Sequence, residues 1–206
     1  MTTRRRFLSH SAEATRALGA ALASRAPAGL LIRLEGDLGA GKTTFSQGFA
    51  RGLGVGEPVT SPSFTLVREY AAARGEEPGI GLAHMDFYRL TDAAAVRDLG
   101  LDDYLAGDDV VIVEWPERAA AGLPARGLRI RLERLPMPDP EADPALAEAL
   151  ARTGGASDEP RRIDIEALDA QGLMLLEHLT LQLPGLLTLE GVAAAGLAPD
   201  ASDAHA

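Results

Sequence analysis

Short apolar runs alternate along this chain with segments whose apolar residues recur at helical spacing. The runs at 29–35, 80–85 and 110–113 have the character of buried parallel strands. Over 45–53 the apolar residues recur every fourth position, which predicts a helix directly after the first run. This order of elements predicts an α/β fold with a mainly parallel central sheet.

The pattern changes toward the two ends of the chain. Near the N-terminus we expect a short strand and then a helix that Ser11 opens, with an apolar face at Leu18, Ala21 and Leu22. Two later runs, 128–133 and 163–166, alternate apolar with charged residues, as strands with one face in water do. We expect these two runs to pair antiparallel at one edge of the sheet.

Composition divides the chain into one domain, residues 1–183, and a C-terminal tail, residues 184–206, which is Ala/Gly-rich and expected to be poorly ordered. Within the domain, residues 135–160 are rich in Pro, Asp, Glu, Ala and Gly, which predicts a solvated acidic insertion with a short helix around 144–152. A second short helix is expected over 91–99, where Thr91 caps it and Gly100 stops it.

The clearest chemistry lies between the first buried strand and its helix, in Gly-Asp-Leu-Gly-Ala-Gly-Lys-Thr at 36–43. The spacing G-x-x-x-x-G-K-[ST] is that of the phosphate-binding loop, and the order strand, loop, helix is the context which that motif requires. Backbone N–H groups of 39–43 and the helix N-terminus offer a cradle for phosphates. The predicted nucleotide-binding residues are Asp37, Leu38, Gly39, Ala40, Gly41, Lys42, Thr43 and Thr44.

Lys42 is the one lysine among 20 basic residues, all the others being arginine. A compact ammonium fits between the terminal phosphates of a nucleotide, whereas a guanidinium is larger and aims its donors in a fixed fork. The Thr43 hydroxyl is placed to bind Mg²⁺. Helix capping explains Thr44 equally well, and Asp37 is more typical of a loop-shaping residue than of a catalyst. The loop therefore predicts a site for ATP and Mg²⁺.

Two carboxylates follow buried strands on the side of the sheet where the loop lies, Asp86 after 80–85 and Glu114 after 110–113. The carboxyl ends of strands in an open α/β sheet are where ligands bind. Lys42, Asp86 and Glu114 are the candidate catalytic residues, and Thr43, Glu114 and Asp86 are the candidate metal ligands. Spacing alone leaves open which acid binds the metal and which orients water.

A hydroxyl-rich segment lies between the loop helix and the first acid, and comprises Thr60, Ser61, Ser63 and Thr65. Nucleotide-dependent switches often place a γ-phosphate sensor here, and a turn around Pro62 explains the composition equally well.

Three further residues flank the two acids. Trp115, the one tryptophan, follows Glu114, and its position suits a core residue, a base-stacking platform or a partner contact. His84 and Arg89 flank Asp86, and a packed or capping role is favoured for His84.

Composition excludes several classes of function. A net charge of −10 argues against a standing nucleic-acid surface, and the lack of cysteine excludes disulfides and thiolate metal sites. No apolar run approaches the roughly 18 residues that a bilayer span needs. Residues 3–8 resemble a twin-arginine export signal, but Glu13, Arg16 and Arg25 interrupt the apolar stretch that should follow. We therefore expect a cytoplasmic protein.

Five segments together resemble the TsaE (YjeE) family of bacterial ATPases. They are G-D-L-G-A-G-K-T-T-F at 36–45, T-S-P-S-F-T-L-V at 60–67, H-M-D-F-Y-R-L at 84–90, L-G-L-D-D-Y at 99–104 and V-E-W-P-E at 113–117. The resemblance covers roughly residues 5–135 and resumes near 161–178, and the ordered set is far more specific than any one motif.

The resemblance implies a three-layer P-loop fold and a slow ATPase that serves threonylcarbamoylation of the adenosine beside the anticodon in ANN-decoding tRNAs. It implies that TsaD and TsaB are the partners and that tRNA is reached through them; we expect the free protein to be monomeric. For the residues, it implies that Thr43 and Glu114 hold Mg²⁺ with Asp86 in the same site. It further implies that Thr60, Ser61 and Thr65 belong to the switch, that Trp115 lies beside the site and that Ser11 lies near the nucleotide.

Three rival functions are weighed against this one. A GTPase usually needs an Asn-Lys-x-Asp segment, which a chain with one lysine in its phosphate loop does not have. A P-loop small-molecule kinase is the main alternative; it would need an acceptor pocket and an arginine-bearing lid, and the 135–160 insertion has Arg152 alone. A nucleotide-gated adaptor with negligible turnover differs from an ATPase only in rate.

Overall fold

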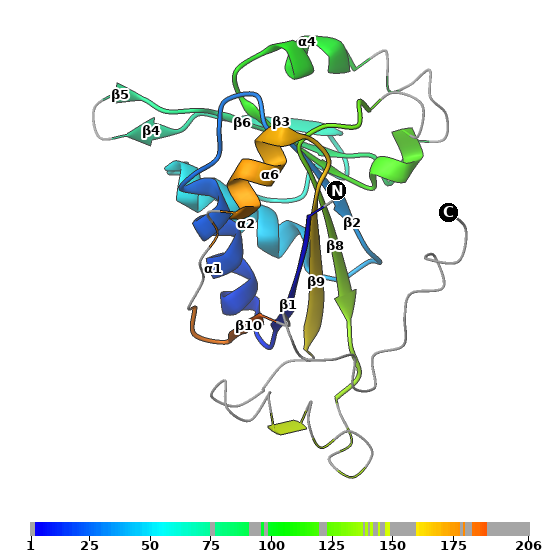
Figure 1. Cartoon of the computed structure of the whole chain (residues 1–206). Helices are drawn as coiled ribbons and strands as arrows, with labels where there is room; N and C mark the ends of the chain where they lie inside the picture. The colour runs from blue at the N-terminus through cyan, green and yellow to red at the C-terminus, as the bar shows by residue number, and fades with distance from the viewer. Residues whose placement is uncertain are drawn as a thin grey trace.

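An eight-stranded sheet runs through the protein in the computed structural model of the chain (Figure 1). Its strand order is β10-β1-β9-β8-β2-β7-β6-β3. The structure describes residues 3–74, 77–90, 96, 99–119, 123–137, 139, 141, 144, 147–148, 160–177, 179 and 183–188.

The sheet strands are β1 (Arg4–Ser9), β2 (Leu31–Glu35), β3 (Val67–Tyr70), β6 (Leu82–Asp86), β7 (Val110–Glu114), β8 (Leu128–Arg134), β9 (Arg161–Ala167) and β10 (Leu186–Thr188). A separate hairpin pairs β4 (Ala73–Arg74) with β5 (Glu77–Pro78). The helices are α1 (Ala12–Ala23), α2 (Lys42–Leu53), α4 (Leu101–Ala106), α6 (Ala170–Glu177) and the 3₁₀ helix Pro116–Ala119.

The four central strands β8, β2, β7 and β6 are parallel, which confirms the predicted α/β class. The predicted antiparallel pairing of 128–133 with 163–166 is also confirmed, with Ile130 opposite Ile165. Strands β1 and β10 continue this antiparallel edge. At the opposite edge β3 pairs antiparallel with β6, a strand that the apolar pattern did not indicate.

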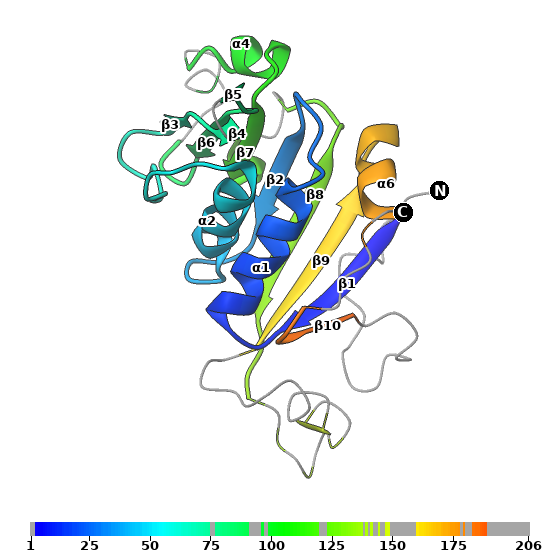
Figure 2. The ribbon, with the colours of Figure 1, turned by 90° about the vertical axis from the view of Figure 1, so that its left-hand side faces the viewer.

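Helices cover the sheet in two layers. α1 and α2 lie across one face (Figure 2), where Leu18, Phe45 and Phe49 are fully buried in the larger core. α6 adds Leu175 and Leu176 to the same core. On the other face a smaller core gathers Met85, Phe87 and Val111 with Leu101 of α4 and other residues. The predicted three-layer arrangement is therefore present.

The first two helices run side by side in the same direction. A Cβ added to Gly48 would lie 2.0 Å from the Arg16 carbonyl oxygen, and one added to Gly52 would lie 2.5 Å from the Ala20 carbonyl oxygen. Glycine therefore lets the two backbones approach closely. As a result, the N-terminus of α1 lies beside that of α2, which begins at the phosphate loop.

Further predictions from the sequence concern where the helices begin and end. Ser11 opens α1 as predicted, since its Oγ accepts a hydrogen bond from the Ala14 amide at 3.0 Å. Gly54 ends α2 at φ 95°, directly after the predicted 45–53 helix. The helices expected over 91–99 and 144–152 fall largely on residues outside the described ones. Among the described residues, no helix has the length and apolar character of a membrane span.

Candidate nucleotide site

The phosphate loop joins β2 to α2 and depends on glycines at three positions. Gly36, Gly39 and Gly41 have φ values of 135°, 78° and 106°. Residues other than glycine rarely adopt a backbone conformation with φ in this range. A Cβ on Gly36 would also lie 2.2 Å from the carbonyl oxygen of Leu132 on β8. The loop is therefore held down on the end of the neighbouring strand, and its curvature is fixed before any ligand binds.

The Lys42 ammonium lies folded back against this loop. Its Nζ donates to the carbonyl oxygens of Gly36 at 2.6 Å and Asp37 at 3.0 Å, and the Trp115 ring centroid lies 4.0 Å from it. Burial lowers the pKa of Lys42 from its ordinary value, while the charges of Glu114 and Asp86 oppose that shift. The site therefore holds a poorly hydrated cation, which a phosphate would neutralise.

Glu114, the last residue of β7, faces the start of α2. The Thr43 hydroxyl donates to Glu114 Oε1 at 3.2 Å, and His84 Nε2 lies 2.9 Å from the same oxygen. Because a carboxylate accepts hydrogen bonds, His84 donates through Nε2. His84 is fully buried, so the predicted packed role comes with a specific contact that fixes one oxygen of Glu114.

Asp86, the last residue of β6, is in register with Glu114 on the adjacent strand. Its Oδ2 accepts hydrogen bonds from the hydroxyls of Ser61 at 2.8 Å and Ser63 at 2.6 Å, and Oδ1 accepts from the Tyr88 amide at 3.0 Å. The two acids therefore differ in surroundings: Glu114 faces Thr43, and Asp86 holds the hydroxyl-rich segment.

The threonines of that segment make other contacts. Thr60 Oγ1 accepts from Arg68 at 2.7 Å, and the Thr65 amide donates to the Pro62 carbonyl at 3.0 Å, which forms the turn considered in the sequence. Leu66, which ends the turn, has φ 65°. A non-glycine residue in this region stores strain and often marks a functional segment.

Trp115 also has a left-handed backbone, with φ 58°. Its ring packs beside that of Tyr88, 5.0 Å between centroids, and over the Lys42 ammonium. Arg89 lies away from this stack, over the exposed ring of Phe64, with 4.4 Å from its Cζ to the centroid. Trp115 is therefore a wall of the site.

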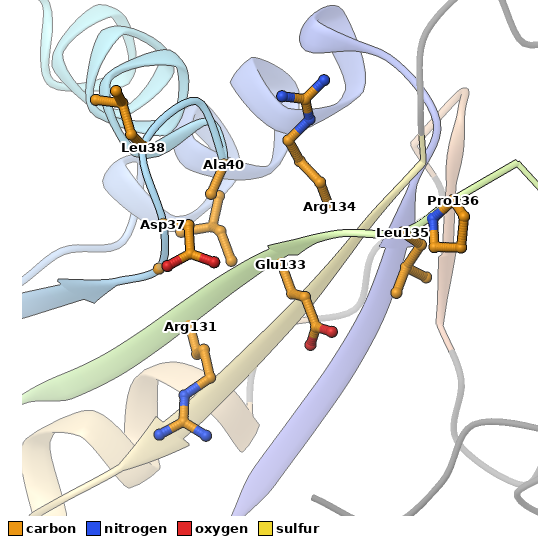
Figure 3. A pocket seen from close by; sticks show the side chains of 10 residues that line it. Asp37, Leu38, Ala40, Arg131, Glu133, Arg134, Leu135 and Pro136 are labelled. Atoms are coloured by element: carbon orange, nitrogen blue, oxygen red, sulfur yellow. The ribbon is translucent and has the colours of Figure 1, made fainter.

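These groups line one cavity of about 360 Å³. Its lining residues are Leu38, Gly39, Gly41, Lys42, Thr43, Thr44, Ser61, Ser63, Asp86, Tyr88, Glu114, Trp115 and Arg161. Asp37 and Ala40 line an adjoining cavity of about 660 Å³ between the loop and the end of β8 (Figure 3). Ser11, Thr60 and Thr65 line neither cavity, although Ser11 caps the helix whose N-terminus lies beside the loop helix.

The donor atoms suit Mg²⁺. The hydroxyl of Thr43 and the carboxylate of Glu114 are hard oxygen ligands that already face each other. Within the described part of the chain, no group of three or more His, Asp or Glu is placed to hold a metal by itself. Mg²⁺ is usually bound by one or two carboxylates together with substrate phosphates and water.

Sequence reasoning missed two lining residues, Tyr88 and Arg161. Tyr88 lies inside the H-M-D-F-Y-R-L segment but was given no role. Arg161 stands two positions before Ile163 in an alternating strand, so it faces the core side of the sheet. The sequence did offer one signal for Arg161: a charged residue occupies a position where the alternation of the strand predicts an apolar, core-facing side chain.

Comparison with known proteins finds a matching family model and several named relatives. A model of the family described as "Threonylcarbamoyl adenosine biosynthesis protein TsaE" matches residues 9–138. A Bacillus subtilis relative named "tRNA threonylcarbamoyladenosine biosynthesis protein TsaE" is 44% identical over 122 residues, 59% of this chain and 73% of the relative. A Treponema pallidum protein of the same name is 38% identical over 130 residues, 63% of this chain and 92% of the relative.

A crystal structure of Bacillus subtilis YdiB has a similar fold. Its TM-score is 0.64 at 33% sequence identity, and the likeness covers 86% of this chain and 94% of YdiB.

Proposed function

The chain belongs to the TsaE family, and from this premise we propose that it is a Mg²⁺-dependent ATPase with low intrinsic turnover. Its activity serves threonylcarbamoylation of the adenosine next to the anticodon in ANN-decoding tRNAs. It acts in the cytoplasm together with TsaD and TsaB, and these partners hold the tRNA. The net charge of −10 agrees with a chain that does not itself grip nucleic acid.

One observation carries the proposal: residues from three separate segments converge at the phosphate loop. Lys42 and Thr43 come from the loop helix, Asp86 from β6 and Glu114 from β7, and all four line the same cavity. The phosphates bind to the loop amides at the N-terminus of α2. Lys42 then exchanges its carbonyl contacts with Gly36 and Asp37 for the phosphate oxygens.

The surroundings of the two acids support different roles. Thr43 and Glu114 hold Mg²⁺, because they already face each other at the start of α2. When bound, Mg²⁺ neutralises charge on the terminal phosphates. Asp86 positions Ser61 and Ser63 at the cavity, and this segment responds to the γ-phosphate. His84 is a positioning residue that orients Glu114.

Low turnover by the free protein is expected where a partner supplies part of the catalytic site. Lys42 is the one lysine, and charge on transferring phosphate is usually stabilised by several groups, often including one from a partner. Partner binding beside the exposed side chains of Leu38 and Phe64 raises the rate.

The proposal is tested by ATP turnover with and without a TsaD–TsaB pair, and by reconstituted tRNA modification. Wild type is compared with Lys42→Ala, Glu114→Ala and Asp86→Asn. We expect slow phosphate release by the free protein and stimulation by the partners. Lys42→Ala and Glu114→Ala abolish both activities, since each removes a group at the phosphates, whereas Asp86→Asn reduces the partner-stimulated rate.

Two outcomes contradict this function. If neither Lys42→Ala nor Glu114→Ala affects tRNA modification, the site is wrongly assigned. If the protein transfers phosphate from ATP to a small metabolite without partners, the kinase alternative is correct.

A further inference from the structure

Two arginines face each other across the end of the β8–β9 ladder. Arg134 is the last residue of β8 and Arg161 the first of β9, and they are direct register partners. They continue the stripe of core-facing positions, since Leu132 and Ile163, the pair two residues further along the ladder, are buried. In Figure 3, Arg134 lies on the same side of β8 as Ala40, whereas Arg131 and Glu133 point to the other side.

Both side chains lie against the phosphate loop. An ideal Cβ on Gly41 would lie 3.2 Å from Arg161 Nε, and one on Gly39 would lie 3.4 Å from Arg134 Nη1. Arg161 shares the 360 Å³ cavity with Lys42 and Thr43, and Arg134 lines the adjoining 660 Å³ cavity. The loop is therefore flanked by two positive charges in addition to the Lys42 ammonium.

Along the β8–β9 ladder, Arg134 and Arg161 differ from the other charged register pairs in the sign of their charges. The other charged register pairs join opposite signs: Arg129 faces Glu166, Arg131 faces Asp164, and Glu133 faces Arg162. Like charges directly opposite each other destabilise a sheet. The one like-charged pair of the ladder thus occurs where the ladder meets the phosphate loop.

We propose that Arg161 is a nucleotide-binding residue that contacts the phosphates common to ATP and ADP, with Arg134 adding a second positive charge beside it. The inference rests on the proposed nucleotide site. A guanidinium binds phosphate oxygens through two parallel N–H donors. Arg161 lies against the loop at Gly41, and the amides of such a loop cradle the α- and β-phosphates, which ADP retains. It lies beyond the residues 9–138 that the family model matches.

The test is the affinity for ATP and ADP in the presence of Mg²⁺, measured by calorimetry and by Trp115 fluorescence. We expect Arg161→Gln to raise both dissociation constants about tenfold, the effect of losing a charge-assisted hydrogen bond. Arg134→Gln has a smaller effect, and Arg161→Lys restores part of the affinity. Arg129→Gln is the matched control, because it lies on the opposite face of β8 and pairs with Glu166 at 2.8 Å; its affinities stay at the wild-type values.

Thermal unfolding of the nucleotide-free variants separates binding from a structural role. If Arg161 acts in nucleotide binding, the Tm of Arg161→Gln without nucleotide stays close to that of wild type. Its Tm rise with ADP is smaller than that of wild type. A lower nucleotide-free Tm with unchanged affinities shows a structural residue and overturns the inference. A loss confined to ATP overturns the assignment to the shared phosphates.

Lys42→Ala is included so that two failures can be told apart. If wild type binds neither nucleotide, the proposed function fails. If wild type binds both and Lys42→Ala does not, but Arg161→Gln matches wild type, the inference on Arg161 alone fails.

Discussion

At the scale of single residues, the protein holds the Lys42 ammonium in a place where burial makes its charge more costly than it is in water. Burial lowers the pKa of Lys42, so between its folded pKa and the ordinary value of 10.5 the unfolded chain binds more protons than the folded one. Below the folded pKa the full cost of the buried charge is present. The free energy of unfolding therefore rises as pH increases through that window.

Lys42→Met removes this cost, so we expect the nucleotide-free variant to be at least as stable as wild type at pH 7. The difference should shrink as pH approaches 10.5. Denaturant unfolding at several pH values measures this difference in the free energy of unfolding. The same variant should lose ATP binding, because the charge that lowers stability is the one that binds phosphate. Arg129→Gln, outside the site, serves as the control. A less stable Lys42→Met protein at pH 7 would mean that the carbonyl and carboxylate contacts outweigh burial.

The residues of the site differ in how far the sequence could predict them. Lys42 and Thr43 follow from a local motif, and Asp86 and Glu114 from their places after apolar runs. The division of roles between the acids could not be predicted, because it depends on contacts such as Ser61 with Asp86, 25 positions apart. Arg161 was missed for the same reason: its neighbour Gly41 lies far away in the chain, and only the β8–β9 register brings them together.

At the scale of elements, the packing of α1 on α2 positions the phosphate-binding helix. Intrinsic propensity favours alanine over glycine in a helix by about 1 kcal/mol. At Gly48, however, an added Cβ would lie 2.0 Å from the Arg16 carbonyl oxygen. We expect Gly48→Ala to destabilise the protein by about 1–3 kcal/mol, because overpacking must push the helices apart.

The measurement is thermal unfolding together with ATP affinity, which should fall since α2 carries Lys42. Gly56→Ala is the matched control: nothing lies within 4 Å of its added Cβ, so its stability should change by less than about 0.5 kcal/mol. Equal stability of the two variants would contradict this view of the helix pair.

The elements themselves were largely predictable from apolar periodicity, which marked α1, α2 and the parallel strands. Short elements were not. β3 has mixed exposure along four residues, and β10 has three residues, of which Leu186 is buried. Too few positions are involved for a period to show, and their pairing partners decide their structure.

At the scale of the whole molecule, the edge strand β10 closes a sheet that would otherwise expose β1. Leu186–Thr188 pair with Phe7–Ser9, and the His10 amide donates to the Gly185 carbonyl at 3.3 Å. A chain that ends at residue 183 lacks this strand. An unpaired strand edge is a template for association with another chain. We therefore expect the shortened protein to have a lower Tm and to form dimers or larger species in size-exclusion chromatography.

The control is a chain that ends at residue 190, which keeps β10 and should match the full chain in Tm and in size. Nucleotide binding gives the second readout. β10 is separated from β2, which carries the phosphate loop, by three strands of the sheet. The affinity for ADP of the folded 1–183 protein should therefore stay close to that of the full chain even as its Tm falls. If affinity and Tm fall together, the edge strand and the nucleotide site are coupled through β1 and α1. If 1–183 matches the full chain in Tm and in size, β10 does not protect the edge.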